Sequence, residues 1–72
     1  MRGYLRYRHP VTGNCYYYRK MMVSDGGGLR PVGCMRHRTH LAMEFPRKRD
    51  SSLVKRQLES LGYQNVRFVP IS

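Results

Sequence analysis

The stretch of residues 33–45, GCMRHRTHLAMEF, constrains the fold most, because no glycine, proline, asparagine, aspartate or serine follows its first residue. Successive side chains of a strand point to opposite faces of a sheet. In an extended conformation Arg36 and Arg38 share one face, whereas Leu41 and Met43 share the other. The alternation therefore predicts a long strand with a cationic face toward solvent and an apolar face toward the core.

Three further strands are predicted around this stretch. Residues 3–9 alternate apolar and cationic side chains, residues 15–23 are rich in tyrosine and methionine, and residues 65–70 return to a strand pattern. Residues 24–32 contain three consecutive glycines and a proline, which predicts a flexible loop.

A helix is predicted over residues 51–61, where apolar side chains recur at helical spacing. The side chain of Asp50, Ser51 or Ser52 can accept a hydrogen bond from the unpaired amides at its start. Gly62 suits the left-handed conformation that ends many helices. The residues expected to pack on the sheet are Leu53, Val54, Leu58 and Leu61.

The element order is thus β-β-β-α-β, and the predicted fold class is α+β: a small three- to four-stranded, mainly antiparallel sheet packed against one helix. At 72 residues the chain is expected to form a single domain, residues 1–72, with a small core. One helix covers only one face of such a sheet. The second face is expected to stay open to solvent or to a ligand.

Charge is the strongest guide to partners. The 14 Lys and Arg residues against 4 Asp and Glu give a formal net charge of +10, which attracts polyanions. Eleven of the 14 are arginines, whose planar guanidinium groups bind phosphates and guanine edges and stack on bases. We therefore predict a non-catalytic protein that binds nucleic acid, DNA or RNA, without a cofactor.

The predicted binding surface is the open sheet face. Its cationic members come from the first and third strands and would contact phosphates or base edges: Arg6, Arg8, Arg36 and Arg38. Tyrosines of the second strand would stack on unpaired bases. The sequence leaves open which face of residues 15–23 is buried. The set assigned to the interface is Tyr16, Tyr18 and Lys20, and the alternative set is Tyr17 and Arg19.

A second cationic patch is predicted around the start of the helix. It comprises Arg47, Lys48, Arg49, Lys55 and Arg56. Helix amides and the helix dipole favour a phosphate at such a position. Asp50 competes with any anion for the same amides, so we place this patch second to the sheet face.

Metal binding and catalysis are the alternatives that the cysteines and histidines suggest. Zinc prefers thiolate and imidazole ligands, but on a strand His37 faces away from Cys34 and His40, so we predict no metal site. A ribonuclease toxin of a toxin-antitoxin type is an alternative function, because acid-base cleavage of RNA needs only an imidazole and a cationic phosphate clamp. His9, His37 and His40 are the candidate residues for it.

Another alternative is an inhibitor or adaptor that binds an acidic protein. An exposed edge strand, such as residues 65–70, would also allow two copies to pair as a homodimer. No stretch approaches the roughly 18 apolar residues of a membrane-spanning helix, and residues 1–7 lack the apolar region of a secretory signal. We therefore expect no membrane partner and a cytoplasmic location, in which Cys15 and Cys34 remain reduced.

Residues 4–14, YLRYRHPVTGN, resemble the first hairpin of the small N-terminal domain with which phage tyrosine integrases bind arm-type DNA sites. The matching positions are Tyr7, Arg8, Pro10, Thr12 and Gly13. In that family the hairpin belongs to a three-stranded sheet that is backed by a helix and enters the major groove. The resemblance implies DNA binding through the sheet by Arg6 and Arg8, without recombinase activity.

Overall fold

The structure, a computed structural model, describes residues 1–71 of the chain. Its elements are β1 (Gly3–Arg8), β2 (Cys15–Val23), β3 (Leu29–Cys34), the 3-10 helices η1 (Arg36–Leu41) and η2 (Lys48–Ser51), α1 (Ser52–Ser60) and β4 (Gln64–Pro70). The predicted α+β class and the order β-β-β-α-β are confirmed. Within the described residues, no helix is both long and apolar enough to cross a membrane.

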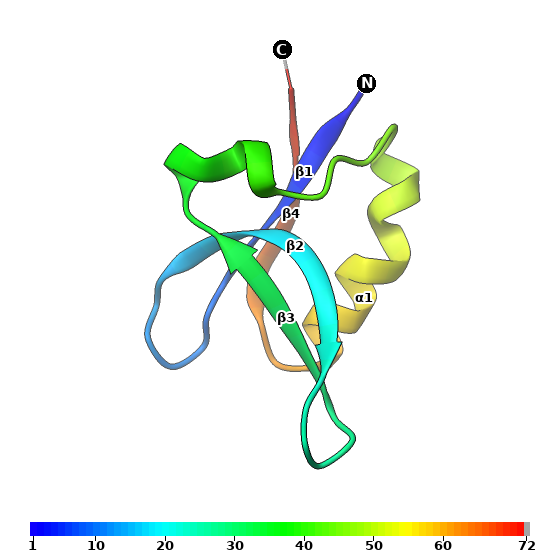
Figure 1. The fold of residues 1–72 in the computed structure, drawn as a ribbon. Coiled ribbons are helices and arrows are strands. Elements are labelled where there is room, and N and C mark those ends of the chain that lie inside the picture. Colours follow the sequence, from blue (N-terminus) through cyan, green and yellow to red (C-terminus); the bar gives the residue numbers. More distant parts are fainter. Residues whose placement is uncertain (72) are drawn as a thin grey trace.

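The four strands form one antiparallel sheet in the order β3-β2-β1-β4 (Figure 1). β1 is an inner strand that pairs with β2 on one side and with β4 on the other. Helix α1 packs against one face, where Leu58 is fully buried. The first and last described residues lie close together, and the Ile71 amide donates a hydrogen bond to the Arg2 carbonyl at 2.8 Å (Figure 1).

β2 bends so that its two halves pair with different strands. Residues 15–17 pair with β1, and residues 17–23 pair with β3. The register between β2 and β3 shifts at Arg19, which has no partner opposite it. Such a bulge adds one residue to a strand, and the side chains beyond it change face.

Phe45 takes the place beside β1 that the bend of β2 leaves vacant. The Gly3 amide donates to the Phe45 carbonyl at 3.0 Å, and the Phe45 amide donates to the Gly3 carbonyl at 2.8 Å. On its other side, a side chain at position 3 would collide with the Phe68 ring and the Val69 carbonyl, so only glycine lets β1 and β4 approach this closely.

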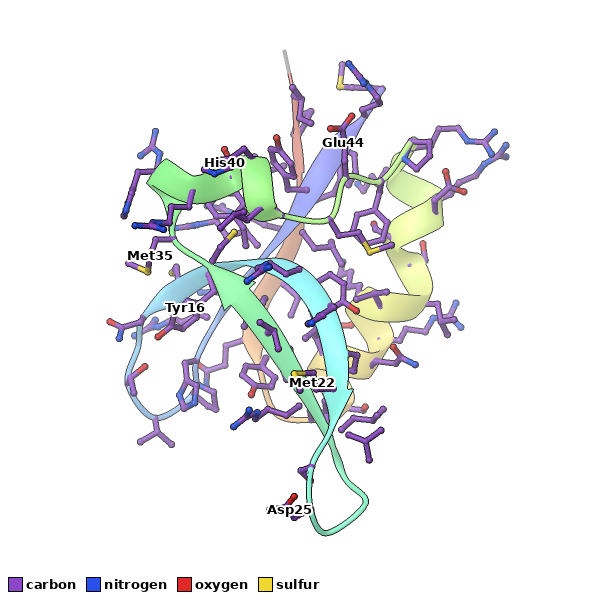
Figure 2. All side chains as sticks on the ribbon, in the orientation of Figure 1. Tyr16, Met22, Asp25, Met35, His40 and Glu44 are labelled. Carbon is purple, nitrogen blue, oxygen red and sulfur yellow. The ribbon has the colours of Figure 1, made fainter. Side chains whose placement is uncertain are left out.

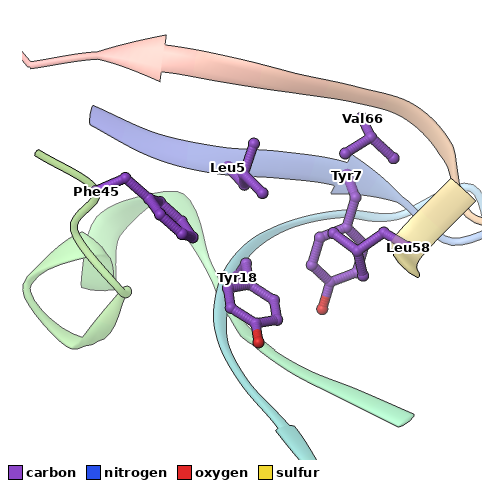
Figure 3. Packing of buried hydrophobic residues seen from close by; sticks show 6 residues of the cluster. All are labelled: Leu5, Tyr7, Tyr18, Phe45, Leu58 and Val66. Atoms are coloured by element: carbon purple, nitrogen blue, oxygen red, sulfur yellow. The ribbon is translucent and has the colours of Figure 1, made fainter. Parts of the chain in front are cut away.

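The core is small and largely aromatic (Figure 3). Its buried members are Leu5, Tyr7, Tyr18, Phe45, Leu58 and Val66. They come from β1, β2, β4, α1 and the segment that precedes η2. The hydroxyl groups of Tyr7 and Tyr18 both point away from β1 and β4 (Figure 3).

We expect Tyr7 to make the fold sensitive to alkali. Burial, followed by the neighbouring Tyr63 and Tyr16, raises the pKa of Tyr7 well above the ordinary value of 10.0. Between these two pKa values the unfolded chain has released the proton that the folded chain still holds, so stability is full below about pH 10 and falls as the pH rises beyond it. Urea midpoints measured from neutral to strongly alkaline pH should show this loss. It should shrink in Tyr7→Phe, and an unchanged pH profile in that variant would contradict the assignment.

The two ends of α1 differ in how well the sequence predicted them. Gly62 has a φ of 94°, and the Tyr63 amide donates to the Leu58 carbonyl at 3.1 Å, which confirms the predicted left-handed stop. At the start, no side-chain hydrogen bond caps the helix among the described residues. The Ser51 hydroxyl instead donates to the Lys48 carbonyl at 2.6 Å, because η2 runs directly into α1.

Only half of the apolar residues predicted on α1 pack against the sheet. Leu58 is buried and Val54 packs against the core, but Leu53 is 66% exposed and Leu61 is 39% exposed. Val54 and Leu58, four residues apart, share the helix face on the sheet, and Leu53 lies off that face. Leu61 lies beyond the end of α1 at Ser60. The prediction for Leu53 and Leu61 is therefore wrong.

The predicted strand over residues 33–45 is also wrong. β3 ends at Cys34, and η1 follows and contacts β2 and β3. Leu41 and Met43, predicted to be in the core, are 40% and 45% exposed. The chain has to turn across the sheet after β3 in order to bring Phe45 beside β1, which a continuous strand would not do.

The predicted loop over residues 24–32 is shorter than expected, because β3 begins at Leu29. A tight hairpin turn joins β2 to β3, and Asp25 lies at its tip (Figure 2). The Ser24 amide donates to the Gly28 carbonyl at 2.7 Å, and the Ser24 hydroxyl donates to the same oxygen at 3.0 Å. Gly27 has a φ of 84°, a left-handed value that favours glycine.

Candidate nucleic-acid interface

The sheet face opposite α1 carries two arginines on neighbouring strands. Residues directly opposite each other in an antiparallel pair project from the same face. Arg6 of β1 lies opposite Arg67 of β4 on one side and opposite Tyr17 of β2 on the other. Leu5 and Tyr7, the neighbours of Arg6 in β1, point into the core. The side chains of Arg6, Arg67 and Tyr17 therefore lie on the open face.

A third arginine reaches this face from η1. Arg36 lines a hollow of about 450 Å³ together with Arg6, Tyr17 and Arg67. The sequence placed Arg36 beside Arg38 on a strand, whereas both lie on η1. Arg38 is exposed and does not line this hollow.

A smaller hollow of about 210 Å³ adjoins the first and shares Arg6 and Arg67 with it. Arg8 and Cys15 line its other side. The register of β1 and β4 shifts here, where Asn65 adopts a left-handed φ of 50°. We call the two hollows together the arginine site, defined by Arg6, Arg8, Arg36 and Arg67.

No carboxylate neutralises the arginine site within residues 1–71. Glu44 pairs with Arg2 at 2.8 Å and Asp50 pairs with Arg47 at 3.3 Å. Asp25 lies at the tip of the β2–β3 hairpin, and the fourth acidic residue belongs to α1 (Figure 2). The guanidinium groups of the site therefore have no internal counter-charge among the described residues.

The tyrosines of β2 lie on faces opposite to those assigned from the sequence. Tyr16 lies opposite Tyr7, and Tyr18 is buried in the core, so both project toward the helix side. Tyr17, from the alternative set, is the one on the open face. It is only 8% exposed, and its ring packs edge-on against Tyr4 with the centroids 5.9 Å apart. Tyr17 therefore offers little surface on which an unpaired base could stack.

Lys20 does lie on the open face, for a reason that the sequence did not reveal. It pairs with Val32 beyond the bulge at Arg19 and is exposed. Without the bulge, Lys20 would share the helix side with Tyr16 and Tyr18.

The cationic patch around the helix start is dispersed. Arg47 is engaged by Asp50, and Lys48 lines a hollow of about 380 Å³ with Met1 and Phe68. Arg49 and Arg56 are exposed, and Lys55 is half-buried. Of these five cations, only Lys48 lines one of the hollows of about 210, 240, 380 and 450 Å³.

Arg67 is the member of the arginine site that the sequence prediction missed. The sequence did contain a signal for Arg67. It lies between the apolar residues Val66 and Phe68, and alternation along a strand places these two on the opposite face. Recognising it required knowledge that β4 pairs with β1, which brings Arg67 beside Arg6.

The cysteines and histidines do not form a metal site in the part of the chain that the structure describes, where no three His, Cys, Asp or Glu side chains gather closely enough. His37 and His40 lie on η1. His9 lies in the β1–β2 turn, where its Nδ1 accepts hydrogen bonds from the amides of Val11 at 3.1 Å and Thr12 at 3.2 Å. His9 thus has a role in holding the hairpin.

Cys15 is placed to report on occupation of the arginine site. It is half-buried in the smaller hollow, whereas Cys34 is buried, and burial raises the pKa of the Cys34 thiol against the opposing effect of Arg19. Because the thiolate is the reactive form, Cys15 should react with iodoacetamide before Cys34 does. Saturating nucleic acid should slow that reaction severalfold, as measured by mass spectrometry. An unchanged Cys15 rate, relative to Cys34, would place the ligand elsewhere.

Comparison with known proteins gives no information about the function of this chain. No protein-family model, no curated protein and no solved structure matches this chain. What the protein does has therefore to be inferred from the geometry and charge of its surface.

Proposed function

We propose that this protein binds nucleic acid by contacting phosphates through the arginine site. The observation that carries this proposal is the pair of Arg6 and Arg67, directly opposite each other and completed by Arg36 around one hollow. Like charges in this position destabilise a sheet. A phosphate between them offsets the repulsion and accepts charge-assisted hydrogen bonds from the guanidinium groups.

Two further observations support a polyanion as the ligand. The net charge of +10 draws an extended anion to the whole surface, and exposed Lys20 and Arg38 add cations beyond the site. The resemblance of residues 4–14 to an integrase hairpin leads independently to Arg6 and Arg8. Because Tyr17 is packed against Tyr4, the contacts proposed are to phosphates rather than to stacked bases.

Anisotropy titrations with labelled duplex DNA, single-stranded DNA and RNA of equal length, each at several salt concentrations, test this proposal. We expect the logarithm of the affinity to fall linearly with the logarithm of the salt concentration. No measurable affinity at low salt for any of the three would refute it. Salt-sensitive binding to an acidic polypeptide alone would favour a protein partner, and cleavage of the RNA would favour the ribonuclease alternative.

A further inference from the structure

A separate hollow of about 240 Å³ lies on the helix side of the sheet. It is lined by Tyr7, His9, Tyr16, Arg30, Gly33 and Tyr63, and we call it the tyrosine hollow. Of these residues only Tyr7 also lines a hollow of the arginine site, the smaller one of about 210 Å³. Three tyrosines and a histidine around one opening are an unusual concentration for a chain that has eight aromatic residues of the Phe, Trp and Tyr types in all, six Tyr and two Phe.

The rings are held in fixed relative positions. Tyr7 packs edge-on against Tyr63 with the centroids 5.2 Å apart, and His9 packs edge-on against Tyr63 at 5.7 Å. Tyr7 and Tyr16 lie 5.9 Å apart with their planes tilted by 38°. Tyr16 and Tyr63 are half-buried, so parts of their rings stay available to a ligand.

Among the polar groups of the hollow, the Tyr7 hydroxyl has the greatest need of a hydrogen-bond partner. Tyr7 is only 2% exposed, and no hydrogen bond joins its hydroxyl to another described residue. Every fully shielded polar side-chain atom of the described chain has a partner, so this oxygen retains a small exposed surface, and Tyr7 lines the tyrosine hollow. Gly33 creates the space, since a side chain there would collide with the Tyr7 hydroxyl.

Two further groups define the charge and hydrogen bonding of the site. The Nδ1 of His9 accepts hydrogen bonds from two amides, so the ring proton lies on Nε2 and is available as a donor. Arg30, exposed on the edge strand β3, lines the hollow and gives it a positive charge. Neither salt bridge of the described residues involves Arg30.

We propose that the tyrosine hollow binds a nucleoside monophosphate, with the base against the half-buried rings of Tyr16 and Tyr63 and the phosphate at Arg30. Aromatic rings stack on any base, and a carbonyl or ring nitrogen of the base can accept the proton of the Tyr7 hydroxyl. The hollow is smaller than the range of about 300–1,000 Å³ usual for drug-sized ligands, which favours one base rather than two.

A quaternary ammonium ion is the other ligand that clustered aromatic rings bind. Arg30 at the hollow and the net charge of +10 both oppose a cation. An anionic ligand with a planar ring satisfies the charge and the rings together.

Titration of the full chain with AMP, followed by amide chemical shifts, tests the proposal. We expect shifts at Gly33 and Tyr63, and weaker binding of adenosine and of ribose 5-phosphate, each of which lacks half of the ligand. Ribose 5-phosphate that binds as tightly as AMP would overturn the role of the rings. Binding of tetramethylammonium in place of AMP, or shifts confined to Arg6, Arg36 and Arg67, would overturn the proposal altogether.

Two conservative variants sharpen the test. Tyr7→Phe removes only the unpartnered hydroxyl, and Arg30→Gln removes an exposed charge, so neither should disturb the fold. Each should weaken AMP binding by roughly threefold to tenfold. Tyr18→Phe and Arg2→Gln are the matched controls, because Tyr18 is a core tyrosine outside the hollow and Arg2 is exposed elsewhere. Equal losses in variants and controls would refute the assignment, whatever the affinity of the unaltered protein.

Discussion

Replacement of Leu58 by Ala is expected to lower the free energy of unfolding by about 2–5 kcal/mol. Leu58 is 0% exposed and is the only residue of α1 that is fully buried in the core among the described residues. A chain of this size rarely has more than about 3–5 kcal/mol of stability, so the variant should be largely unfolded at room temperature. Urea denaturation followed by circular dichroism measures the change.

Leu53→Ala provides the matched control for this prediction. The same side chain is removed from the same helix, but Leu53 is 66% exposed. Its loss should change stability by less than about 0.5 kcal/mol, the range usual for surface substitutions. Equal destabilisation by the two variants would mean that α1 packs with a different face than the structure shows.

Conversion of both Arg36 and Arg67 to Gln is expected to cause the largest loss of nucleic-acid affinity. Each arginine that neutralises a phosphate contributes about 0.9 to the slope of the log affinity against the log salt concentration on duplex DNA. The double variant should therefore flatten this slope by roughly two units and each single variant by roughly one. Both side chains are exposed, so the fold should be retained.

Arg2→Gln separates contact at the arginine site from a general effect of charge. It lowers the net charge by the same unit as either single variant, and Arg2 does not line the arginine site. Its salt slope should stay close to that of the unaltered protein. If Arg2→Gln flattens the slope as much as Arg67→Gln does, binding is diffuse and the arginine site is not the interface.

The features that the sequence predicted well were those set by neighbouring residues. The left-handed stop at Gly62, the strand over residues 15–23 and the single helix each follow from local patterns, and the structure contains all three. A sheet with one helix then follows from the need to bury one apolar face, which is why the fold class was predictable.

The predictions that were wrong depended on contacts between distant segments. Alternation over residues 33–45 fits a strand, but Phe45 bonds with Gly3, and this pairing requires the chain to turn at η1. Likewise, a single bulge at Arg19 decides which face Lys20 occupies. Neither the pairing of Phe45 with Gly3 nor the bulge at Arg19 leaves a signal in the residues that surround it.

The candidate site shows the same division. Arg6 and Arg8 were predicted because β1 alternates clearly, and Arg36 was predicted although the element assigned to it was wrong. Arg67 was missed because its importance comes from lying opposite Arg6. The residues that make a binding site can thus be visible in the sequence while their arrangement is not.

The pairing of β1 with β4 also bears on how this protein reaches its native state. It joins Gly3 to Pro70, so nearly the whole described chain forms the loop between them. Contacts between such distant residues form slowly, because the entropy of closing the loop is lost before the contact is gained. We therefore expect the β1–β2 hairpin to form early and the junction of Arg6 with Arg67 to form late. A partly folded chain would carry the full positive charge, but it would lack the arrangement of arginines that we propose binds a phosphate.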